Sequence, residues 1–166
     1  PFGWIIVIYA VLNLAYSFKL KHVVIVDVLI VAAGFVLRVA AGVALVNVVR
    51  FSPWLYMCMA LLALFLGFAK RRRELANAGE HASRQRAVLS RYTPDLLDAL
   101  LAATAAASVI AYALYTIWPG TVAKFGTEAL LYTVPFVAYG IFRYLYLVRA
   151  TEHGEDPSLV LIRDAP

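Results

Sequence analysis

Residues 12–42 read LNLAYSFKLKHVVIVDVLIVAAGFVLRVAAG, and this stretch decides the fold class of the chain. Most of it is apolar enough to cross a bilayer, yet Asp27 and Arg38 lie inside its second apolar run. An ionised side chain within a membrane helix is costly, so it normally faces the interior of a helix bundle or a water-filled cavity. The stretch therefore predicts a transmembrane helix with one face turned away from lipid.

The composition indicates that most of the remaining chain also lies in a lipid bilayer. Of the 166 residues, 63% are hydrophobic and 15% are charged, and the mean hydropathy is +0.79. Soluble domains carry about a quarter charged residues. Cys58 is the only cysteine, which excludes an intrachain disulfide and a cysteine-based metal site. The net charge of +5 fits the basic cytoplasmic loops of a membrane protein, so no nucleic-acid partner is expected.

Five apolar segments have lengths that suit membrane-spanning helices rather than barrel strands. We therefore expect an all-α fold, a polytopic transmembrane helical bundle that forms one domain over residues 1–166. Ser52 and Thr93 each precede a proline and are expected N-caps. The turn WPG at 118–120 is expected to end the fourth helix. The predicted helices cover residues 2–18, 23–49, 53–69, 94–118 and 127–148.

The distribution of Lys and Arg predicts the orientation of these helices. Segments 17–22 and 70–93 and the tail after residue 148 hold eleven Lys and Arg, against two in the other loops. Because cytoplasmic loops carry an excess of these residues, the three segments are expected on the cytoplasmic side. The three tryptophans then share the opposite interface, where aromatic belts lie; they are Trp4, Trp54 and Trp118.

Asp27 and Arg38 share one helical face with Gly34 and Gly42. About 16 Å of helix rise separates the two charges, which is too far for a direct salt bridge. We expect Asp27 to face a cavity at the cytoplasmic side and to orient a neighbouring cation or a substrate hydroxyl. Arg38 is expected to anchor the deeper wall against another helix, and the glycines to allow close helix approach. The alternative is that each charge pairs with a neighbouring helix for structural reasons only.

Residues 70–75, KRRREL, open the predicted cytoplasmic loop 70–93, whose remainder has enough helix formers for one short surface helix. Positive-inside topology and contact with anionic lipid head groups would explain four adjacent cations at a helix end. The same cations suit a clamp for phosphate, because Arg offers paired N–H donors and Lys a point charge. Lys19 and Lys21 fall at the same membrane level, so we favour a site for an amphiphile with a phosphate head. The predicted phosphate ligands are Lys21, Lys70, Arg71 and Arg72.

Several motifs together resemble one protein family. The resemblance is carried by NLAYSFKLKHVVIVD at 13–27, the GFVLR…AG helix that follows, FAKRRREL at 68–75, RYTPDLLD at 91–98 and HGEDPSLVLIRD at 153–164. These stretches are similar to the C-terminal half of the UbiA superfamily of intramembrane prenyltransferases, and within it to the decaprenyl-phosphate phosphoribosyltransferases. We therefore expect the chain to be the C-terminal part of a longer protein.

The resemblance implies a bundle with a lateral opening to lipid and a polar cavity facing the cytoplasm, in a bacterial plasma membrane. It implies transfer of 5-phosphoribose from phosphoribosyl pyrophosphate to a polyprenyl (decaprenyl) phosphate, with release of pyrophosphate. The product would serve the synthesis of cell-wall arabinan, a part of arabinogalactan. Asp27 is the expected catalytic residue, and Asn13, Tyr16 and Arg38 are expected in the same cavity.

The resemblance also bears on metal binding. Typical members of the superfamily bind Mg²⁺ through two Asp-rich motifs, of which the first, NDxxDxxxD, belongs to the N-terminal half. The second would fall where this chain has KRRREL, so cations replace an acidic cluster. We therefore expect an Mg²⁺-dependent enzyme whose metal ligands lie in the preceding N-terminal part and not in this piece.

Two other functions stay open at the level of the sequence. A superfamily prenyltransferase would move an isoprenoid onto another acceptor, and acidic rather than basic residues at 70–74 would favour it. A non-catalytic, lipid-binding membrane subunit would tolerate neutral substitution of Asp27 and of the basic clusters, whereas either enzyme would not. Membrane lipids are expected partners in every case, and assembly with further copies of the chain is also open.

Overall fold

The structure is a computed structural model that describes residues 2–46, 52–78 and 89–150. Within these ranges every regular element is a helix. In chain order the elements are α1 (Phe2–Phe18), η1 (Leu20–His22), α2 (Val26–Val46), α3 (Pro53–Ala78), η3 (Leu89–Arg91), α5 (Pro94–Ile117), α6 (Pro119–Phe125), η4 (Ala129–Thr133) and α7 (Val134–Ala150).

Four helical segments of the described chain are long and apolar enough to cross a membrane. They are Val26–Leu45, Pro53–Asn77, Pro94–Ile117 and Ala129–Ala150. This confirms the predicted all-α, polytopic transmembrane bundle. The first apolar segment is helical too, but α1 has only 17 residues, fewer than the roughly 20 that span the hydrocarbon of a bilayer.

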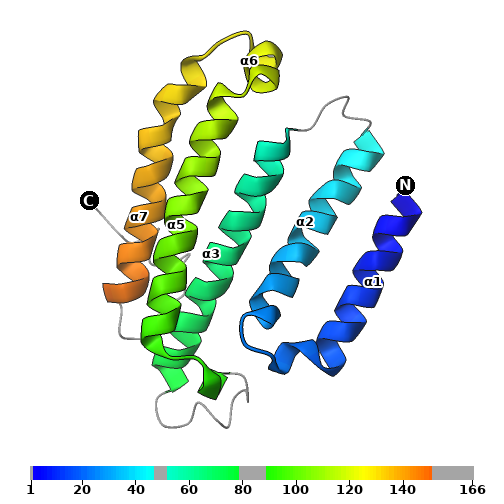
Figure 1. The fold of residues 1–166 in the computed structure, drawn as a ribbon, viewed down its shortest axis with the longest axis vertical. Coiled ribbons are helices and arrows are strands. Elements are labelled where there is room, and N and C mark those ends of the chain that lie inside the picture. The colour runs from blue at the N-terminus through cyan, green and yellow to red at the C-terminus, as the bar shows by residue number, and fades with distance from the viewer. Residues whose placement is uncertain (1, 47–51, 79–88, 151–166) are drawn as a thin grey trace.

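In Figure 1 the long helices stand side by side in a row, and α7 contacts α3 as well as α5. Their order in space follows their order in the chain, because α1 packs on α2, α2 on α3, α3 on α5 and α5 on α7. We call one end of the row the basic end: there α1 and α3 finish, α2 and α5 begin, and Lys19, Lys21, residues 70–73 and Arg149 lie. The opposite end, where α3 begins and α6 lies, is called the far end.

The far end carries all three tryptophans. Trp4 lies at the start of α1, Trp54 at the start of α3, and Trp118 directly after α5. Aromatic residues of this kind anchor membrane helices at the level of the lipid head groups. The separation of tryptophans from the basic end therefore agrees with a membrane whose two faces lie at the two ends of the row.

Local sequence signals correctly predict the start of α3 at Pro53 and both ends of α5. The Thr93 hydroxyl accepts a hydrogen bond from the Leu96 N–H at 3.2 Å and caps α5, with Pro94 as the first helical residue. Trp118 terminates α5, as the WPG turn predicts. Ser52 precedes α3, but its Oγ has no hydrogen-bond partner in the described part of the chain, so the expected side-chain cap is wrong.

α3 extends further than its apolar part. The sequence placed the end of this helix at residue 69, but α3 continues through the basic run to Ala78, so the expected loop 70–93 begins as helix. Lys, Arg, Glu, Leu and Ala are all good helix formers, and they sustain the helix after the hydrophobic pattern stops. The short surface helix expected in this loop falls largely on residues 79–88, outside the described residues.

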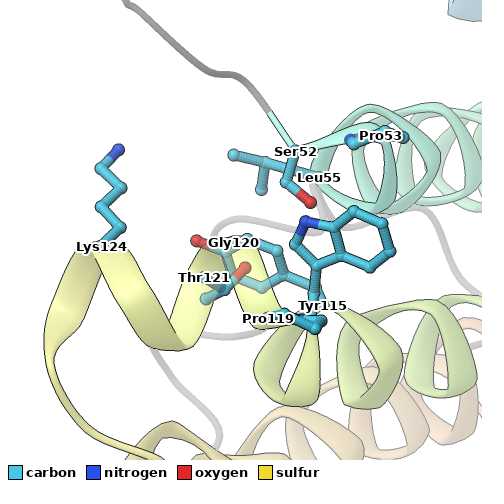
Figure 2. A pocket seen from close by; sticks show the side chains of 9 residues that line it. Ser52, Pro53, Leu55, Tyr115, Pro119, Gly120, Thr121 and Lys124 are labelled. Carbon is cyan, nitrogen blue, oxygen red and sulfur yellow. The ribbon is translucent and has the colours of Figure 1, made fainter.

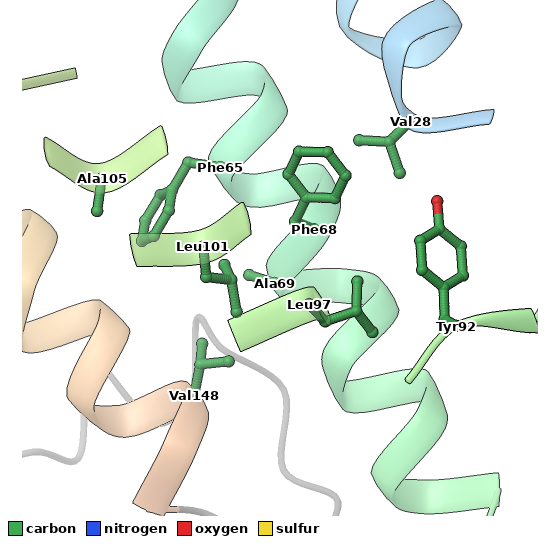
Figure 3. Close-up of a cluster of buried hydrophobic side chains, with 9 residues drawn as sticks. All are labelled: Val28, Phe65, Phe68, Ala69, Tyr92, Leu97, Leu101, Ala105 and Val148. Carbon is green, nitrogen blue, oxygen red and sulfur yellow. The ribbon is translucent and has the colours of Figure 1, made fainter. Parts of the chain in front are cut away.

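The core lies near the basic end, where α3, α5 and α7 meet (Figure 3). Phe65 of α3 packs edge-on against Tyr144 of α7, with ring centroids 5.5 Å apart. Ala69 and Ala105 are fully buried, which lets α3 and α5 approach closely. The buried cluster is Val28, Phe65, Phe68, Ala69, Tyr92, Leu97, Leu101, Ala105 and Val148.

The close contact between α2 and α3 depends on Gly67 rather than on the glycines of α2. A Cβ at Gly67 would lie 2.5 Å from Cγ1 of the buried Val28. At Gly34 an added Cβ would make only an ordinary contact of 3.6 Å with Tyr9, and at Gly42 it would meet nothing within 4 Å. The expectation that Gly34 and Gly42 permit close packing is therefore wrong. The residue that permits the close contact is Gly67 on α3.

Candidate functional site

The cations of the basic run point in different directions because they lie on a helix. Successive residues of an α-helix are rotated by about 100°, so neighbours in the sequence face different elements. Lys70 is exposed and lines a pocket between α1, α2 and α3. Arg71 is buried against Asp27 of α2, whereas Arg72 faces Asp98 of α5. The four cations of residues 70–73 therefore do not form a single phosphate clamp of equivalent side chains.

Asp27 and Arg71 form a buried ion pair between α2 and α3. The Asp27 side chain is fully buried, and its Oδ2 accepts a hydrogen bond of 2.7 Å from Arg71 Nε. Arg71, 5% exposed, also donates through Nη1 to the carboxylate of Glu74, one turn further along α3. A buried charge is tolerated only when it is paired and hydrogen-bonded. Each ion in this cluster meets that condition.

Tyr92 connects the ion pair to the turn before α2. Its hydroxyl donates to Asp27 Oδ1 at 2.7 Å and accepts the N–H of Ile25 at 2.7 Å. Ile25 has a φ of +68°, a left-handed conformation that is strained for a β-branched residue. Burial raises the pKa of Tyr92, and the hydrogen bond to Asp27 raises it further, so the phenol stays protonated and donates. The cluster holds the strained turn in place.

These contacts show where two predicted site residues lie. Asp27 was expected to face a cavity, but it lies in the core and is not among the residues that line the pocket. Its expected interaction with a neighbouring cation does occur, and the cation is Arg71. Arg71 was expected to hold a phosphate, but its guanidinium already binds two carboxylates in a buried place. In this structure both residues join helices, and the site lies beside them.

Arg72 is the second predicted phosphate ligand with a carboxylate partner. Its Nε lies 3.0 Å from Asp98 Oδ1, and Arg149 Nε lies 3.8 Å from the same oxygen. Arg149 Nη2 also donates to the Asp98 carbonyl at 3.0 Å. Asp98 thus links α3, α5 and α7 at the basic end. All three side chains are partly exposed, so this arrangement contributes less to stability than a buried pair.

The pocket between α1, α2 and α3 has a volume of about 620 Å³ and a mainly apolar wall. Lys70 lies at its basic end, and Asn13 and Tyr16 line it from the last turns of α1. The structure therefore brings Lys70 together with the three residues that were expected in a cavity, Asn13, Tyr16 and Arg38. The apolar wall includes Ile30, Val31, Phe35, Met59, Leu62 and Leu66. Such a pocket can take an apolar chain with an anionic group at its cationic end.

Arg38 lines the deeper part of this pocket and joins α2 to α1. Its Nε donates to the Tyr9 hydroxyl at 3.0 Å, and its guanidinium carbon lies 5.3 Å from the centre of the Tyr9 ring. A hydrogen bond and a cation–π contact therefore both stabilise the Arg38 guanidinium. Arg38 contacts another helix at depth, as the sequence analysis expected. The partner is a tyrosine, not a carboxylate.

Lys21 is placed apart from the pocket. It lies in η1 at the basic end, and the pocket lining does not include it. The sequence analysis also missed the partners that organise this end of the protein. Tyr92 and Asp98 belong to the motif RYTPDLLD, and Glu74 to KRRREL, so the motifs marked them without indicating their contacts. The residues missed are Tyr9, Glu74, Tyr92 and Asp98.

Comparison with known proteins adds independent information. No family model matches the sequence. The chain is 33% identical to the decaprenyl-phosphate phosphoribosyltransferase of Mycolicibacterium smegmatis over 67% of its own length and 35% of that protein. The enzyme of the same name from Corynebacterium glutamicum is 30% identical over 95% of this chain and 47% of that protein. An uncharacterized protein of Sinorhizobium fredii is 31% identical over 98% of this chain and 32% of that protein.

The chain is a homologue of the decaprenyl-phosphate phosphoribosyltransferases. It spans between about a third and a half of the length of the curated relatives that it matches. The similarity to the Corynebacterium enzyme covers nearly all of this chain, so it includes both the pocket and the ion-pair cluster.

The described residues of this phosphoribosyltransferase homologue do not form a metal site. Within residues 2–46, 52–78 and 89–150 no group of three or more His, Cys, Asp or Glu side chains could hold a metal ion. Two carboxylates at the basic end, Asp27 and Glu74, are both engaged by Arg71. The described residues therefore do not fit the Mg²⁺ ion that the family resemblance implies.

Proposed function

We propose that the full-length protein is a membrane transferase of the UbiA type that moves 5-phosphoribose from phosphoribosyl pyrophosphate to a polyprenyl phosphate. In this proposal the present chain supplies the binding site for the lipid acceptor. The protein lies in a bacterial plasma membrane with its basic end in the cytoplasm, where the soluble phosphoribosyl donor is available.

The single observation that carries the proposal is the pocket between α1, α2 and α3. Its mainly apolar wall suits an isoprenoid chain, and Lys70 lies at the end where the lipid's phosphate would reach the membrane surface. Lys70 is also the member of the basic run that lines this pocket, whereas Arg71 and Arg72 face carboxylates. Lys21, at the same end, is a second candidate ligand for phosphate.

The residues fit the chemistry of this transfer. A phosphate oxygen of the acceptor is already anionic, so it needs no general base and depends on correct positioning. A Lys ammonium fixes that oxygen as a point charge and offsets the repulsion between two polyanionic substrates. Asn13 and Tyr16 line the same part of the pocket and can orient the head group by hydrogen bonding.

The proposal is tested by replacing Lys70 with glutamine in the full-length protein. Transfer of radiolabelled phosphoribose into extracted lipid is measured at increasing concentrations of polyprenyl phosphate. Loss of one charge-assisted hydrogen bond, about 1.5–3 kcal/mol, should lower kcat/KM for the lipid roughly ten- to hundredfold. The KM for phosphoribosyl pyrophosphate should change much less.

Lys19→Gln is the matched control, because Lys19 is exposed at the same end of the protein and does not line the pocket. Its kcat/KM for the lipid should stay near that of the wild type. If both variants lost activity equally, a general effect of basic charge at the membrane surface would explain the result. Absence of phosphoribosyl transfer by the wild-type protein would reject the proposed reaction itself.

A further inference from the structure

A second pocket lies at the far end, away from Lys70 and the ion-pair cluster. It has a volume of about 450 Å³ and lies between the start of α3, the end of α5 and α6. Figure 2 shows Ser52 and Leu55 on one side and Thr121 and Lys124 on the other. Residues from separate parts of the chain therefore enclose it.

Two hydroxyls of this pocket have no hydrogen-bond partner. The Oγ1 of Thr121 and the Oγ of Ser52 are both buried and unpaired within the described part of the chain. Thr121 is only 2% exposed, and Figure 2 shows its hydroxyl oxygen turned into the pocket. Buried hydroxyls are nearly always paired, because an unpaired one has lost its hydrogen bonds to water without gaining another partner. The unpaired hydroxyls indicate that the pocket takes a polar ligand.

The other polar groups of the pocket define the charge of that ligand. Lys124 and the indole Nε1 of Trp118 can only donate hydrogen bonds. None of the nine described residues that line the pocket is acidic. Gly120 belongs to the same wall, and a Cβ there would lie 2.7 Å from Trp118 Nε1, so a glycine is needed to keep the indole in place. Donors and one cation together favour an anionic ligand that is rich in acceptor oxygens.

The position of the pocket in the membrane further limits the classes of ligand that it could bind. Pro53 starts one membrane-spanning segment and Ile117 ends another, so the pocket lies where spans end and lipid head groups begin. Trp118, 38% exposed, lies at this level, as interfacial tryptophans do. We propose that the far-end pocket binds a phosphate group, supplied by the head group of an anionic phospholipid or by free inorganic phosphate. This site is independent of the proposed transferase site.

Trp118 provides a direct probe for the proposed ligand. The chain has three tryptophans, so replacing Trp4 and Trp54 with phenylalanine leaves Trp118 as the only one in this part of the protein. The full-length protein, with any tryptophan outside this chain also replaced, is placed in nanodiscs of phosphatidylcholine with increasing fractions of phosphatidylglycerol. A saturable change in Trp118 emission is expected. Thr121→Val should raise the half-saturating fraction about tenfold, and Thr121→Ser, which keeps the hydroxyl, should restore it.

A second titration distinguishes the two sources of phosphate. Inorganic phosphate is added to nanodiscs of pure phosphatidylcholine, with chloride at the same ionic strength as the reference. A saturable response to inorganic phosphate that Thr121→Val weakens would support a free anion as the ligand. A response to phosphatidylglycerol alone would support the lipid head group.

Matched controls separate binding from general effects. Thr127→Val changes an exposed threonine in the same region, and it should leave both titrations unchanged. Lys124→Gln should weaken the response, whereas Lys19→Gln at the basic end should not. The proposal is overturned if Trp118 responds to neither probe, or if Thr121→Val and Lys124→Gln both respond like the parent protein.

Discussion

Asp27 receives a hydrogen bond on each of its two carboxylate oxygens, one from Arg71 and one from the Tyr92 hydroxyl. Since the side chain is fully buried, these two donors take the place of the water that would solvate the ion. Arg71 is balanced in turn by Glu74. The charges of this cluster depend on one another, so the loss of one member leaves another without compensation.

Asp27→Asn should therefore destabilise the protein strongly, by about 3–5 kcal/mol, because it breaks a buried ion pair. Reversible unfolding in mixed micelles of mild and denaturing detergent measures this loss. A double variant that also carries Arg71→Met should be less destabilised than the sum of the two single variants. Additive losses would contradict the pairing.

Tyr92→Phe should cost about 1–3 kcal/mol, because it leaves Asp27 Oδ1 and the Ile25 N–H without their partner. The raised pKa of Tyr92 also predicts a pH dependence. In the unfolded chain tyrosine loses its proton near pH 10, whereas in the folded protein Tyr92 keeps it. Stability should therefore be maintained below about pH 10 and fall as the pH rises further. Unfolding measured across this range should show a shallower fall in Tyr92→Phe than in the wild type.

At the scale of the element, three neighbouring cations of α3 face three different environments. Its helical rotation turns Lys70 to the pocket, Arg71 to Asp27 and Arg72 to Asp98. The same helix presents Gly67 to α2, where the side chain of Val28 occupies the space of a Cβ. Thus α3 both forms a wall of the pocket between α1, α2 and α3 and sets the distance between that wall and α2.

Gly67→Ala should destabilise the protein by about 1–3 kcal/mol, because the new methyl group would overlap the stiff, buried Val28. Gly140→Ala on α7 is the control, since a Cβ there meets nothing within 4 Å. Alanine is the better helix former by about 0.5–1 kcal/mol, so this second change should be neutral or stabilising. Equal unfolding free energies for the two variants would show that α2 and α3 are not in tight contact at Gly67.

At the scale of the whole molecule, the two ends of the helix bundle differ in their chemistry. The basic end holds Lys70 and the ion-pair cluster, and the far end holds the tryptophans and the second pocket. A membrane that contains the long helices must place these two ends at opposite faces, because four of the described helical segments are long enough to cross it. Positive-inside topology predicts that the basic end faces the cytoplasm.

This orientation can be tested by labelling single cysteines in a Cys58→Ala background. Cysteines at Asn77, the exposed end of α3, and at Glu128, after α6, mark the two ends. A membrane-impermeant maleimide added to intact cells should modify the cysteine at Glu128 but not the one at Asn77. The cysteine at Asn77 should react once the membrane is permeabilised. The reverse pattern would place Lys70 outside the cell and remove the proposed access of the phosphoribosyl donor.

The amino-acid sequence alone was sufficient to predict five apolar helices, of which four are long enough to span a membrane, together with the cap at Thr93, the end of α5 at Trp118 and the separation of cations from tryptophans. Hydropathy, capping and charge distribution are local properties, and each apolar segment partitions into the bilayer according to its own sequence. These features can therefore be predicted without knowledge of the contacts between helices. The family resemblance also implied that Asn13, Tyr16 and Arg38 share a cavity, and all three line one pocket.

Contacts between helices, in contrast, determine which charged side chains are paired and which line a pocket. Asp27, Arg71 and Arg72 look like site residues in the sequence, yet their partners lie on other helices or one turn away. The far-end pocket likewise joins Ser52 to Thr121, which no local pattern connects. The physical reason is that the state of a buried charge or hydroxyl depends on the group that packing brings against it, and packing joins residues distant in the chain.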